Sequence, residues 1–247
     1  MPWRDNTSTY AILVSEIMLQ QTQVSRVLIL FPRFVKQFPS FAALARAKQS
    51  AAIRAWQGLG YNRRALALHR AARIIMERFS GQLPKDRRAL LSLPGIGPAT
   101  ASSIRAFAFN IPEVFIETNI RSVFIHEFFP RRKKVRDEEL TPLIAAALDR
   151  KNPREWYWSL MDYGAHIKSL HKNPNRRSAQ YARQSPFHGS LRKVRGEILK
   201  ALAAAPSLSA AHLREKISAP QGHFSGALSA LIREGFCDNS QGNVSLI

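Results

Sequence analysis

Apolar residues recur at helical spacing along almost the whole chain, and this pattern constrains the fold more than any other feature. Ile53, Trp56 and Leu59, for example, follow one another at three-residue intervals, as the apolar face of a helix does. Prolines and glycines interrupt the pattern often enough to give helices of ordinary length. Strand signals are sparse before the last dozen residues. We therefore predict that the body of the protein is all-α.

The charge of the chain indicates a polyanionic partner. Lys and Arg total 37 against 17 Asp and Glu, which gives a formal net charge of +20 over 247 residues. A charge of this size favours binding to nucleic acid, although a membrane surface would attract it as well. We find no apolar run long enough to span a bilayer and no signal-peptide pattern at the start. We expect a cytoplasmic protein, associated with the bacterial nucleoid and not with a membrane.

The cysteine content limits the available chemistry. Cys237 is the one cysteine in the sequence, which excludes an internal disulfide and every multi-cysteine metal site. A site of histidines and carboxylates remains formally open, but the seven histidines show no HExxH-like spacing. We therefore predict no metal site and no redox chemistry.

The sequence divides near residue 185 into residues 1–185 and a second unit, residues 186–247. The first helix of the second unit carries an apolar stripe of Leu191, Val194, Ile198 and Leu202. Ser209 can cap a second helix, and a third helix around residues 224–234 ends at Gly235. Residues 236–247 fit a short hairpin that turns near residues 241–242. This pattern predicts a winged-helix-like module, which either contacts DNA or only packs against the first unit.

A glycine-containing turn joins two predicted helices at residues 93–98. Asp86 can cap the first helix, and Pro98 fits the first turn of the second. Gly95 and Gly97 allow positive φ and expose backbone N–H groups next to the positive end of the second helix. Such a turn can bind a DNA phosphate, although an isolated GxG also occurs in ordinary helix–helix turns.

Glu16 lies in a helical segment, residues 10–24, among mostly apolar neighbours three and four positions away. Burial raises the pKa of a carboxyl group, which suits a proton donor. The alternative for a single glutamate is an ordinary solvated helix residue.

Several segments resemble, in the right order, the helix-hairpin-helix DNA glycosylases of the MutY and endonuclease III type. They are residues 2–4 (PWR), 10–24, 56–61 (WQGLGY) and 93–101 (LPGIGPATA). The resemblance covers about residues 2–184 and implies a two-lobed helical glycosylase fold. It places Glu16 at the glutamate that protonates the departing base and helps to activate water, and it places Arg4 in the segment that lines the base pocket.

The resemblance also implies a second acidic group, at Glu117, where the family carries an aspartate. An anion beside the sugar stabilises the oxocarbenium character that develops as the glycosidic bond breaks. Glu117 retains the charge but is one methylene longer, so it either retunes the site or inactivates it. Asn119 matches an asparagine of the adenine glycosylases and is expected to orient the water or the sugar.

Other positions refine the expected chemistry. Bifunctional relatives form a Schiff base with a lysine where this chain has Ala99, so we predict hydrolysis without a lyase step. The side chains that replace the flipped base are expected from residues 20–22 and from Tyr61 and Asn62, although the family often has tyrosine at the latter position. The full set of expected DNA and substrate contacts is Arg4, Gln20, Gln21, Thr22, Tyr61, Asn62, Gly95, Gly97 and Thr100.

Family members hold a four-iron cluster with the spacing C-x6-C-x2-C-x5-C. That spacing falls here on Lys168, Asn175, Ser178 and Gln184, none of which provides a thiolate. We predict a basic loop without a cluster, and no cofactor other than a structural monovalent ion at the hairpin. The last ~60 residues also differ from the large domain with which MutY-type enzymes inspect oxoguanine, so recognition of the opposite base is expected to differ.

The function predicted from the sequence is that of a monomeric, monofunctional DNA glycosylase acting on double-stranded DNA that contains a lesion or mismatch. The flipped base would be an adenine in a mispair or a modified or mismatched pyrimidine. The alternative is a non-catalytic DNA-binding or lesion-sensing protein on the same scaffold.

Overall fold

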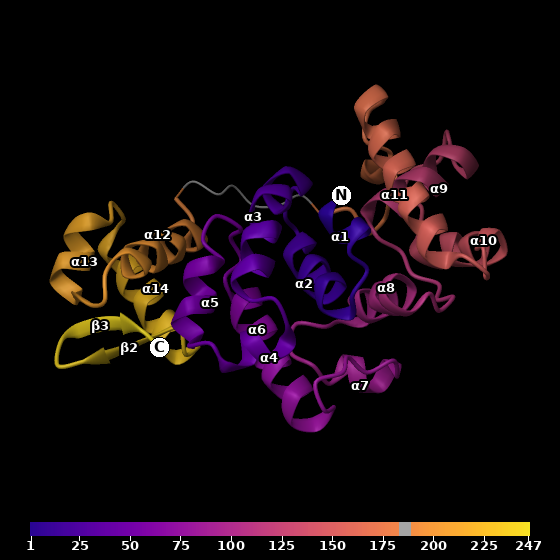
Figure 1. Cartoon of the computed structure of the whole chain (residues 1–247). Helices are drawn as coiled ribbons and strands as arrows, with labels where there is room; N and C mark the ends of the chain where they lie inside the picture. Colours follow the sequence, from indigo (N-terminus) through magenta and orange to yellow (C-terminus); the bar gives the residue numbers. More distant parts are fainter. Residues whose placement is uncertain (183–188) are drawn as a thin grey trace.

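The computed structural model describes residues 1–182 and 189–247, and it confirms the predicted, mainly helical fold (Figure 1). The helices of the first half are α1 (Pro2–Asp5), α2 (Thr9–Leu19), α3 (Val24–Gln37), α4 (Phe41–Arg46), α5 (Gln49–Ala55), α6 (Arg63–Arg78), α7 (Arg87–Leu91) and α8 (Pro98–Phe109). They are followed by α9 (Thr118–Phe128), α10 (Asp137–Ala147), α11 (Pro153–Leu170), the 3-10 helix η1 (Pro174–Arg177), α12 (Leu191–Ala204), α13 (Ala210–Lys216) and α14 (Gln221–Arg233). None of the helices that the structure describes is long and apolar enough to cross a membrane.

Polar side chains mark the starts of several helices. The Asp86 carboxylate accepts a hydrogen bond from the backbone N–H of Ala89 at 2.8 Å, and Ser209 likewise caps α13. Both caps follow the sequence prediction. Ser8 caps α2 by accepting from Ala11. Each of these side chains satisfies a backbone N–H that the first helical turn leaves without a partner.

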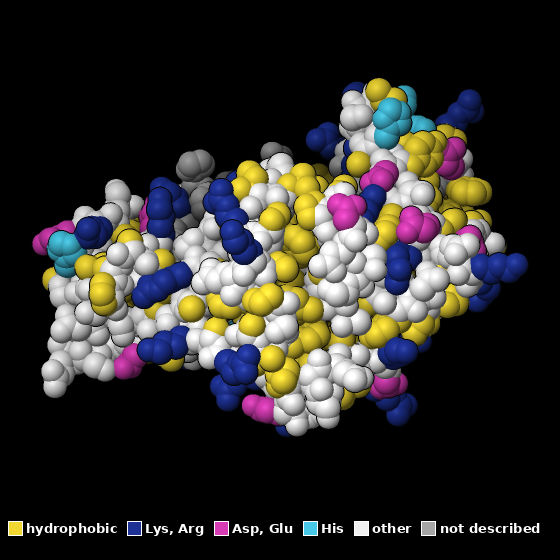
Figure 2. Space-filling model, viewed as in Figure 1, with side chains coloured by type: hydrophobic (Ala, Val, Ile, Leu, Met, Phe, Trp, Pro, Cys, Tyr) yellow, Lys and Arg dark blue, Asp and Glu magenta, His cyan; other side chains and the backbone are white. Residues whose placement is uncertain are grey.

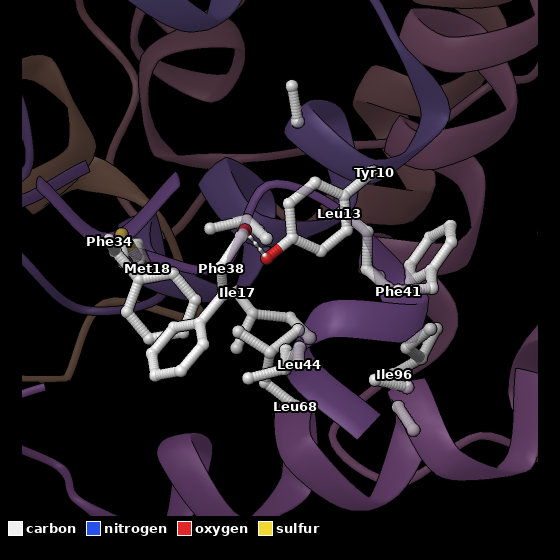
Figure 3. Close-up of a cluster of buried hydrophobic side chains, with 14 of the residues drawn as sticks. Tyr10, Leu13, Ile17, Met18, Phe34, Phe38, Phe41, Leu44, Leu68 and Ile96 are labelled. Carbon is white, nitrogen blue, oxygen red and sulfur yellow. Dashed lines mark hydrogen bonds between the residues drawn. The ribbon is translucent and has the colours of Figure 1, made fainter. Parts of the chain in front are cut away.

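Two hydrophobic cores build the body of the protein. The first lies among α1 to α8; within it the Tyr10 hydroxyl donates to the carbonyl of Phe38, between the rings of Phe34 and Phe41 (Figure 3). The second core lies mainly among α9, α10 and α11. Helices α2 and α8 contribute to both, through Ile12 of α2 and Phe107 of α8 in the second core. The junction of the two lobes is therefore formed by α2 and α8.

The C-terminal module has the predicted winged-helix-like arrangement of three helices followed by a hairpin. Strands β1 (Leu208–Ser209), β2 (Cys237–Ser240) and β3 (Asn243–Leu246) form an antiparallel sheet in the order β1-β3-β2. The β2–β3 turn lies at Gln241 and Gly242, as predicted, and both residues have positive φ. Strand β1 was not predicted because two residues carry no alternating pattern.

The buried apolar stripe of α12 is shorter than the sequence pattern indicates. Val194, Ile198 and Leu202 are buried, but Leu191 is 48% exposed, so the prediction of a four-residue apolar stripe is wrong at its first position. Leu191 is the first residue of α12 and does not belong to the hydrophobic core of the module. The predicted domain boundary after residue 185 lies outside the described residues.

The module packs directly on the first lobe, beside α5 (Figure 1). Ile53 of α5 and Leu66 of α6 belong to the hydrophobic core of the module. Gln49 donates to the carbonyl of Gly235 at 2.6 Å, and Arg54 donates to the carbonyl of Ala203 at 3.0 Å. Apolar burial and hydrogen bonds to backbone carbonyls together fix the position of the module on the first lobe.

Candidate active site and nucleic-acid interface

Glu16 lies on α2, at the junction of the two lobes. Its neighbours Leu13 and Ile17 are fully buried, whereas the Glu16 side chain retains partial access to solvent. Loss of solvation raises the pKa of Glu16 to about 7, and the negative charge of Glu117 adds to this effect. Near neutral pH the carboxyl group is therefore protonated in a large fraction of molecules, which is the state that a proton donor needs.

Ser103 of α8 contacts this carboxyl group, and the sequence analysis missed it. Its hydroxyl oxygen lies 2.5 Å from Oε2 of Glu16 and 3.1 Å from the carbonyl oxygen of Thr100. A hydroxyl has one proton, so two arrangements are available. When Glu16 is ionised, Ser103 donates to its carboxylate. When Glu16 is protonated, Glu16 donates to the Ser103 oxygen and Ser103 donates to the carbonyl of Thr100. Ser102 and Ser103 are both buried in α8. Adjacent serines in an otherwise apolar helix were the available signal, because buried hydroxyls require partners.

Glu117 is the N-cap of α9. Its Oε1 accepts from the backbone N–H groups of Asn119 and Ile120 at 2.5 and 2.9 Å, and Nδ2 of Asn119 lies 3.4 Å from Oε2. Burial raises the pKa of Glu117, although the two backbone hydrogen bonds and the positive charges of Lys168 and Arg121 act in the opposite direction. The carboxylate is thus held at the positive end of a helix.

Helix α11 approaches the start of α9 closely at Gly164. A Cβ atom at Gly164 would lie 2.8 Å from the carbonyl carbon of Asn119, so only glycine fits there. Lys168 follows one helical turn later, on the same face of α11. Burial lowers the pKa of its ammonium group, and the charge of Glu117 opposes that shift. In the sequence, Lys168 was notable only as a position that lacks a cluster cysteine, so its place beside Glu117 was not predicted.

The hairpin between α7 and α8 is present, with one correction. Gly95 has a φ of +82°, as predicted, and a Cβ there would lie 2.9 Å from Cβ of Ala67. Gly97 has a φ of −91°, so the prediction of positive φ is wrong at this position. Gly97 is the extended N-cap of α8, and α8 begins at Pro98 as predicted. A Cβ at Gly97 would meet no neighbour, so a ligand can approach its backbone closely.

The turn at residues 20–22 is attached to this hairpin. Nε2 of Gln20 donates to the carbonyl of Gly95 at 3.0 Å and to Oγ1 of Thr100 at 3.1 Å. Gln21 and Tyr61 have φ values of 53° and 46°, which are uncommon for residues other than glycine. Such strained positions are frequent at binding sites.

Arg64 of α6 supports the same region, and sequence analysis did not identify it. Its guanidinium is buried and donates to the carbonyls of Ile17, Met18 and Gln20 at 2.9, 2.8 and 2.6 Å. These carbonyls lie at the C-terminal end of α2, where a positive charge is favourable. Burial lowers the pKa of Arg64 to about 10, so the group remains charged. It also donates to Thr22. Residues 20–22, Tyr61 and Asn62, which are expected to replace the flipped base, are called the wedge residues. Arg64 therefore fixes the backbone at the first group of these wedge residues.

The remaining predicted contacts separate into two groups. Thr22, Tyr61 and Asn62 line one open groove with Gln20 and Gln21. Arg4 does not join them: its guanidinium forms a two-pronged ion pair with Asp162, at 2.7 and 2.9 Å, and ties α1 to α11.

The segment that replaces the cluster loop is held by hydrogen bonds. Asn175 and Ser178 are buried, and Val135 donates to the carbonyl of Arg177 at 2.9 Å. Gln184 lies outside the described residues. Because Lys168, Asn175 and Ser178 offer an ammonium, an amide and a hydroxyl, this donor set does not fit an iron–sulfur cluster.

Comparison with known proteins establishes the family. The chain belongs to the HhH-GPD superfamily of base excision DNA repair proteins, whose profile matches residues 14–147, more than half of the sequence. An adenine DNA glycosylase of Mycobacterium tuberculosis is 32% identical over 226 residues, which cover 83% of this chain and 74% of the relative. An adenine DNA glycosylase of Buchnera aphidicola is 33% identical over 175 residues, which cover 70% of this chain. The matched region spans only 50% of that relative's length.

Relatives with a different named base are also similar. A thymine/uracil-DNA glycosylase of Pyrobaculum aerophilum is 32% identical over 68% of this chain and 75% of the relative. The structure of a thermostable thymine-DNA glycosylase matches with a TM-score of 0.60 and 24% identity, over 70% of this chain and 82% of that chain. An endonuclease III in a non-covalent complex with DNA matches with a TM-score of 0.56 and 14% identity, over 69% of this chain and 86% of that chain. Family membership therefore leaves the excised base open.

Proposed function

We propose that this protein is a monofunctional DNA glycosylase that hydrolyses the N-glycosidic bond of a flipped base. The observation that carries the proposal is the position of the Glu16 carboxyl group, which lies at the junction of the two lobes in contact with Ser103 of α8. Burial there raises its pKa to about 7, so that it can be protonated at neutral pH. A protonated carboxyl group can donate to the departing base and, once ionised, accept a proton from the attacking water.

Glu117 would act on the sugar in the same reaction. Breaking the glycosidic bond leaves positive charge on C1′ and the ring oxygen, which a nearby carboxylate stabilises. Water then adds at C1′ and loses its proton to Glu16, so that the products are the free base and an abasic site. Ala99 offers no amine at the position of the lyase lysine, which favours hydrolysis by water.

Lesion-containing double-stranded DNA is the proposed substrate, bound by a monomer. The exposed backbone of Gly95 and Gly97, at the start of α8, is suited to a phosphate, and the net charge of +20 favours a polyanion. We propose no iron–sulfur cluster, because the required thiolates are absent from the sequence. A monovalent cation at the hairpin remains part of the proposal, although the Gly95 carbonyl already accepts from Gln20.

The test is single-turnover base release followed by alkaline cleavage. The duplexes carry adenine opposite oxoguanine or guanine, uracil, thymine opposite guanine, or hydroxymethyluracil, and Glu16→Gln is the control. We expect release of at least one base, abolished in the control. The similarity to both adenine and thymine/uracil glycosylases is the reason to include both classes of base. Tight binding without release from any duplex would contradict the proposal.

A non-catalytic, lesion-sensing role is the second candidate. It is favoured by one observation: Oε1 of Glu117 already accepts hydrogen bonds from two backbone N–H groups of α9. The Glu117 side chain is also one methylene longer than the family's aspartate. The Glu117→Asp variant separates the candidates. Base release that appears only in this variant would identify the natural chain as a binder, whereas release by both chains supports the enzyme.

A further inference from the structure

An open groove lies beside the contact between the first lobe and the C-terminal module. Residues 20–23 and 57–64 form one wall, and α12 and α14 form the other. Its volume is about 1420 Å³, which exceeds the ~300–1000 Å³ typical of small-molecule sites. The groove is therefore large enough for part of a polymer.

The groove is strongly basic. Among its lining residues, seven are Lys or Arg and Glu234 is the one acid. Glu234 is already paired: Arg63 of the first lobe and Arg195 of the module both lie 2.6 Å from its carboxylate oxygens. Lys200 and Arg233 are exposed, and neither has an ion-pair partner among the residues that the structure describes. Figure 2 shows Lys and Arg side chains on several parts of one face, including the end occupied by α12 to α14. The positive charges of Lys200 and Arg233 are therefore available to an anionic ligand in the groove.

Small residues form part of the groove on the module side. Gly196 of α12 and Gly226 of α14 line it, and a Cβ atom at either position would meet no atom within 4 Å. Ala230 lies one turn beyond Gly226. A sugar–phosphate backbone can thus approach the two helices closely while Lys200 and Arg233 contact its phosphates.

The groove adjoins the two candidate DNA-binding turns, which are the hairpin at residues 93–98 and the turn at residues 20–22. Gln20 joins the hairpin to the turn at residues 20–22, and Arg64 joins that turn to the loop before α6 through Thr22. Tyr61 of that loop accepts a hydrogen bond from Arg192 of α12 at 2.8 Å. The order across the surface is therefore hairpin, expected wedge residues, and C-terminal module.

We propose that this groove binds the DNA strand opposite the flipped nucleotide, with Lys200 and Arg233 contacting its phosphates. The inference rests on the proposed function, which places the lesion strand at the hairpin. A duplex held there, with residues 20–22 and Tyr61 inserted into its stack, presents its second strand on the far side of the wedge residues, where the groove lies. The module would thereby bring its own helices to the strand that carries the opposite base.

Site-directed crosslinking tests which strand lies in the groove. Cys237 is 1% exposed, so a cysteine introduced at an exposed position is the accessible thiol in this 247-residue chain. Lys200→Cys and the control Lys216→Cys, on α13 outside the groove, each receive a thiol-attached photoreactive group. The probe is a duplex with a tetrahydrofuran abasic analogue opposite guanine. We expect Lys200→Cys to crosslink to the strand opposite the analogue, and Lys216→Cys to give at least tenfold less product.

Affinity measurements on the same duplex provide an independent test. The Lys200→Gln/Arg233→Gln variant is expected to bind about tenfold more weakly near 0.15 M salt, with a slope of log K against log salt reduced by about two, since two phosphate contacts are lost. Lys216→Gln should change neither quantity. Crosslinks to the lesion strand alone, or to neither strand while the duplex remains bound, would overturn the inference.

The two proposals can fail separately. The abasic analogue has no base to release, so these measurements do not depend on catalysis. If the protein releases a base but the Lys200→Cys probe does not crosslink to the opposite strand, the glycosylase proposal is supported and the proposal of strand binding in the groove is rejected. Crosslinking to that strand without base release from any duplex would support strand binding in the groove and reject the catalytic proposal.

Discussion

The hydroxyl oxygen of Ser103 lies 2.5 Å from Oε2 of Glu16, and this contact connects α8 of the hairpin to α2 at the junction of the two lobes. Ser103 also lies one turn after Thr100, whose hydroxyl accepts from Gln20. The candidate proton donor and the candidate phosphate-binding hairpin are therefore coupled through one helix. A change at the hairpin can reach Glu16 by moving α8.

The rate of base release should depend on the protonation of Glu16. Burial raises the pKa of this group to about 7, so the acid form predominates below that pH and is lost above it. We expect a single-turnover rate that falls about tenfold per pH unit above about 7. Rates measured from pH 5.5 to 9, at saturating protein, test this; a rate that stays constant up to pH 9 would exclude Glu16 as the acid.

Ionisation of Glu16 should destabilise the folded protein. Because the folded-state pKa exceeds the ordinary value of 4.5, the stability contributed by the protonated group is complete below pH 4.5 and is lost as pH rises to about 7. Glu16→Gln, which cannot ionise, should therefore raise the free energy of unfolding at pH 8 by up to about 3 kcal/mol. Urea unfolding at pH 4.5 and pH 8 measures the difference. An equal effect at both pH values would argue against burial as the cause.

Ser103→Ala should shift the pH dependence of base release. The hydrogen bond from Ser103 lowers the pKa of Glu16, so its removal raises that pKa further. We expect the alkaline limb to move upward by about one pH unit, since a hydrogen bond to a charged group contributes about 1.5–3 kcal/mol. Ser102→Ala is the matched control, because Ser102 Oγ lies 3.4 Å from Glu113 and not near Glu16. The same shift in both variants would indicate a general disturbance of α8.

Lys168→Met should weaken catalysis through Glu117. The positive charge of Lys168 lowers the pKa of Glu117, so its loss favours the neutral, inactive form of that carboxyl group. We expect the rate of base release to be about tenfold lower than that of the natural chain in the acidic range, and this difference to shrink as pH rises, with DNA affinity almost unchanged. Lys172→Met, at an exposed position nearby, is the control. A drop in affinity without a change in rate would assign Lys168 to DNA binding instead.

Gly164→Ala should separate α11 from α9. The new Cβ would overlap the carbonyl group of Asn119, so we expect a loss of about 1–3 kcal/mol in unfolding free energy and a displaced Glu117. Gly222→Ala is the control: Gly222 lies in the first turn of α14, outside the groove, and a Cβ atom there meets no atom within 4 Å. Thermal unfolding and base release of both variants test this. Equal stability of the two would show that α11 moves without cost.

The sequence determined much of the local structure. Helical periodicity, the caps at Asp86 and Ser209, and the start of α8 at Pro98 depend on neighbouring residues, and all of them were predicted correctly. The hairpin motif and Glu16 were singled out through the resemblance of their segments to the helix-hairpin-helix glycosylases, since residue type alone left ordinary alternatives open. Gly97 was misjudged because a glycine accepts both signs of φ, and the surrounding chain selects one.

Tertiary structure decided the surroundings of these residues. Ser103 meets Glu16 across 87 positions of sequence, and Arg64 reaches carbonyls 44 to 47 residues away. Likewise, Arg192 reaches Tyr61 only because Ile53 and Leu66 are buried in the core of the C-terminal module. No local pattern encodes such contacts, since they arise from the packing of distant apolar faces. The pKa of Glu16 and the position of the basic groove therefore depend on packing, whereas the helices and caps follow from local sequence.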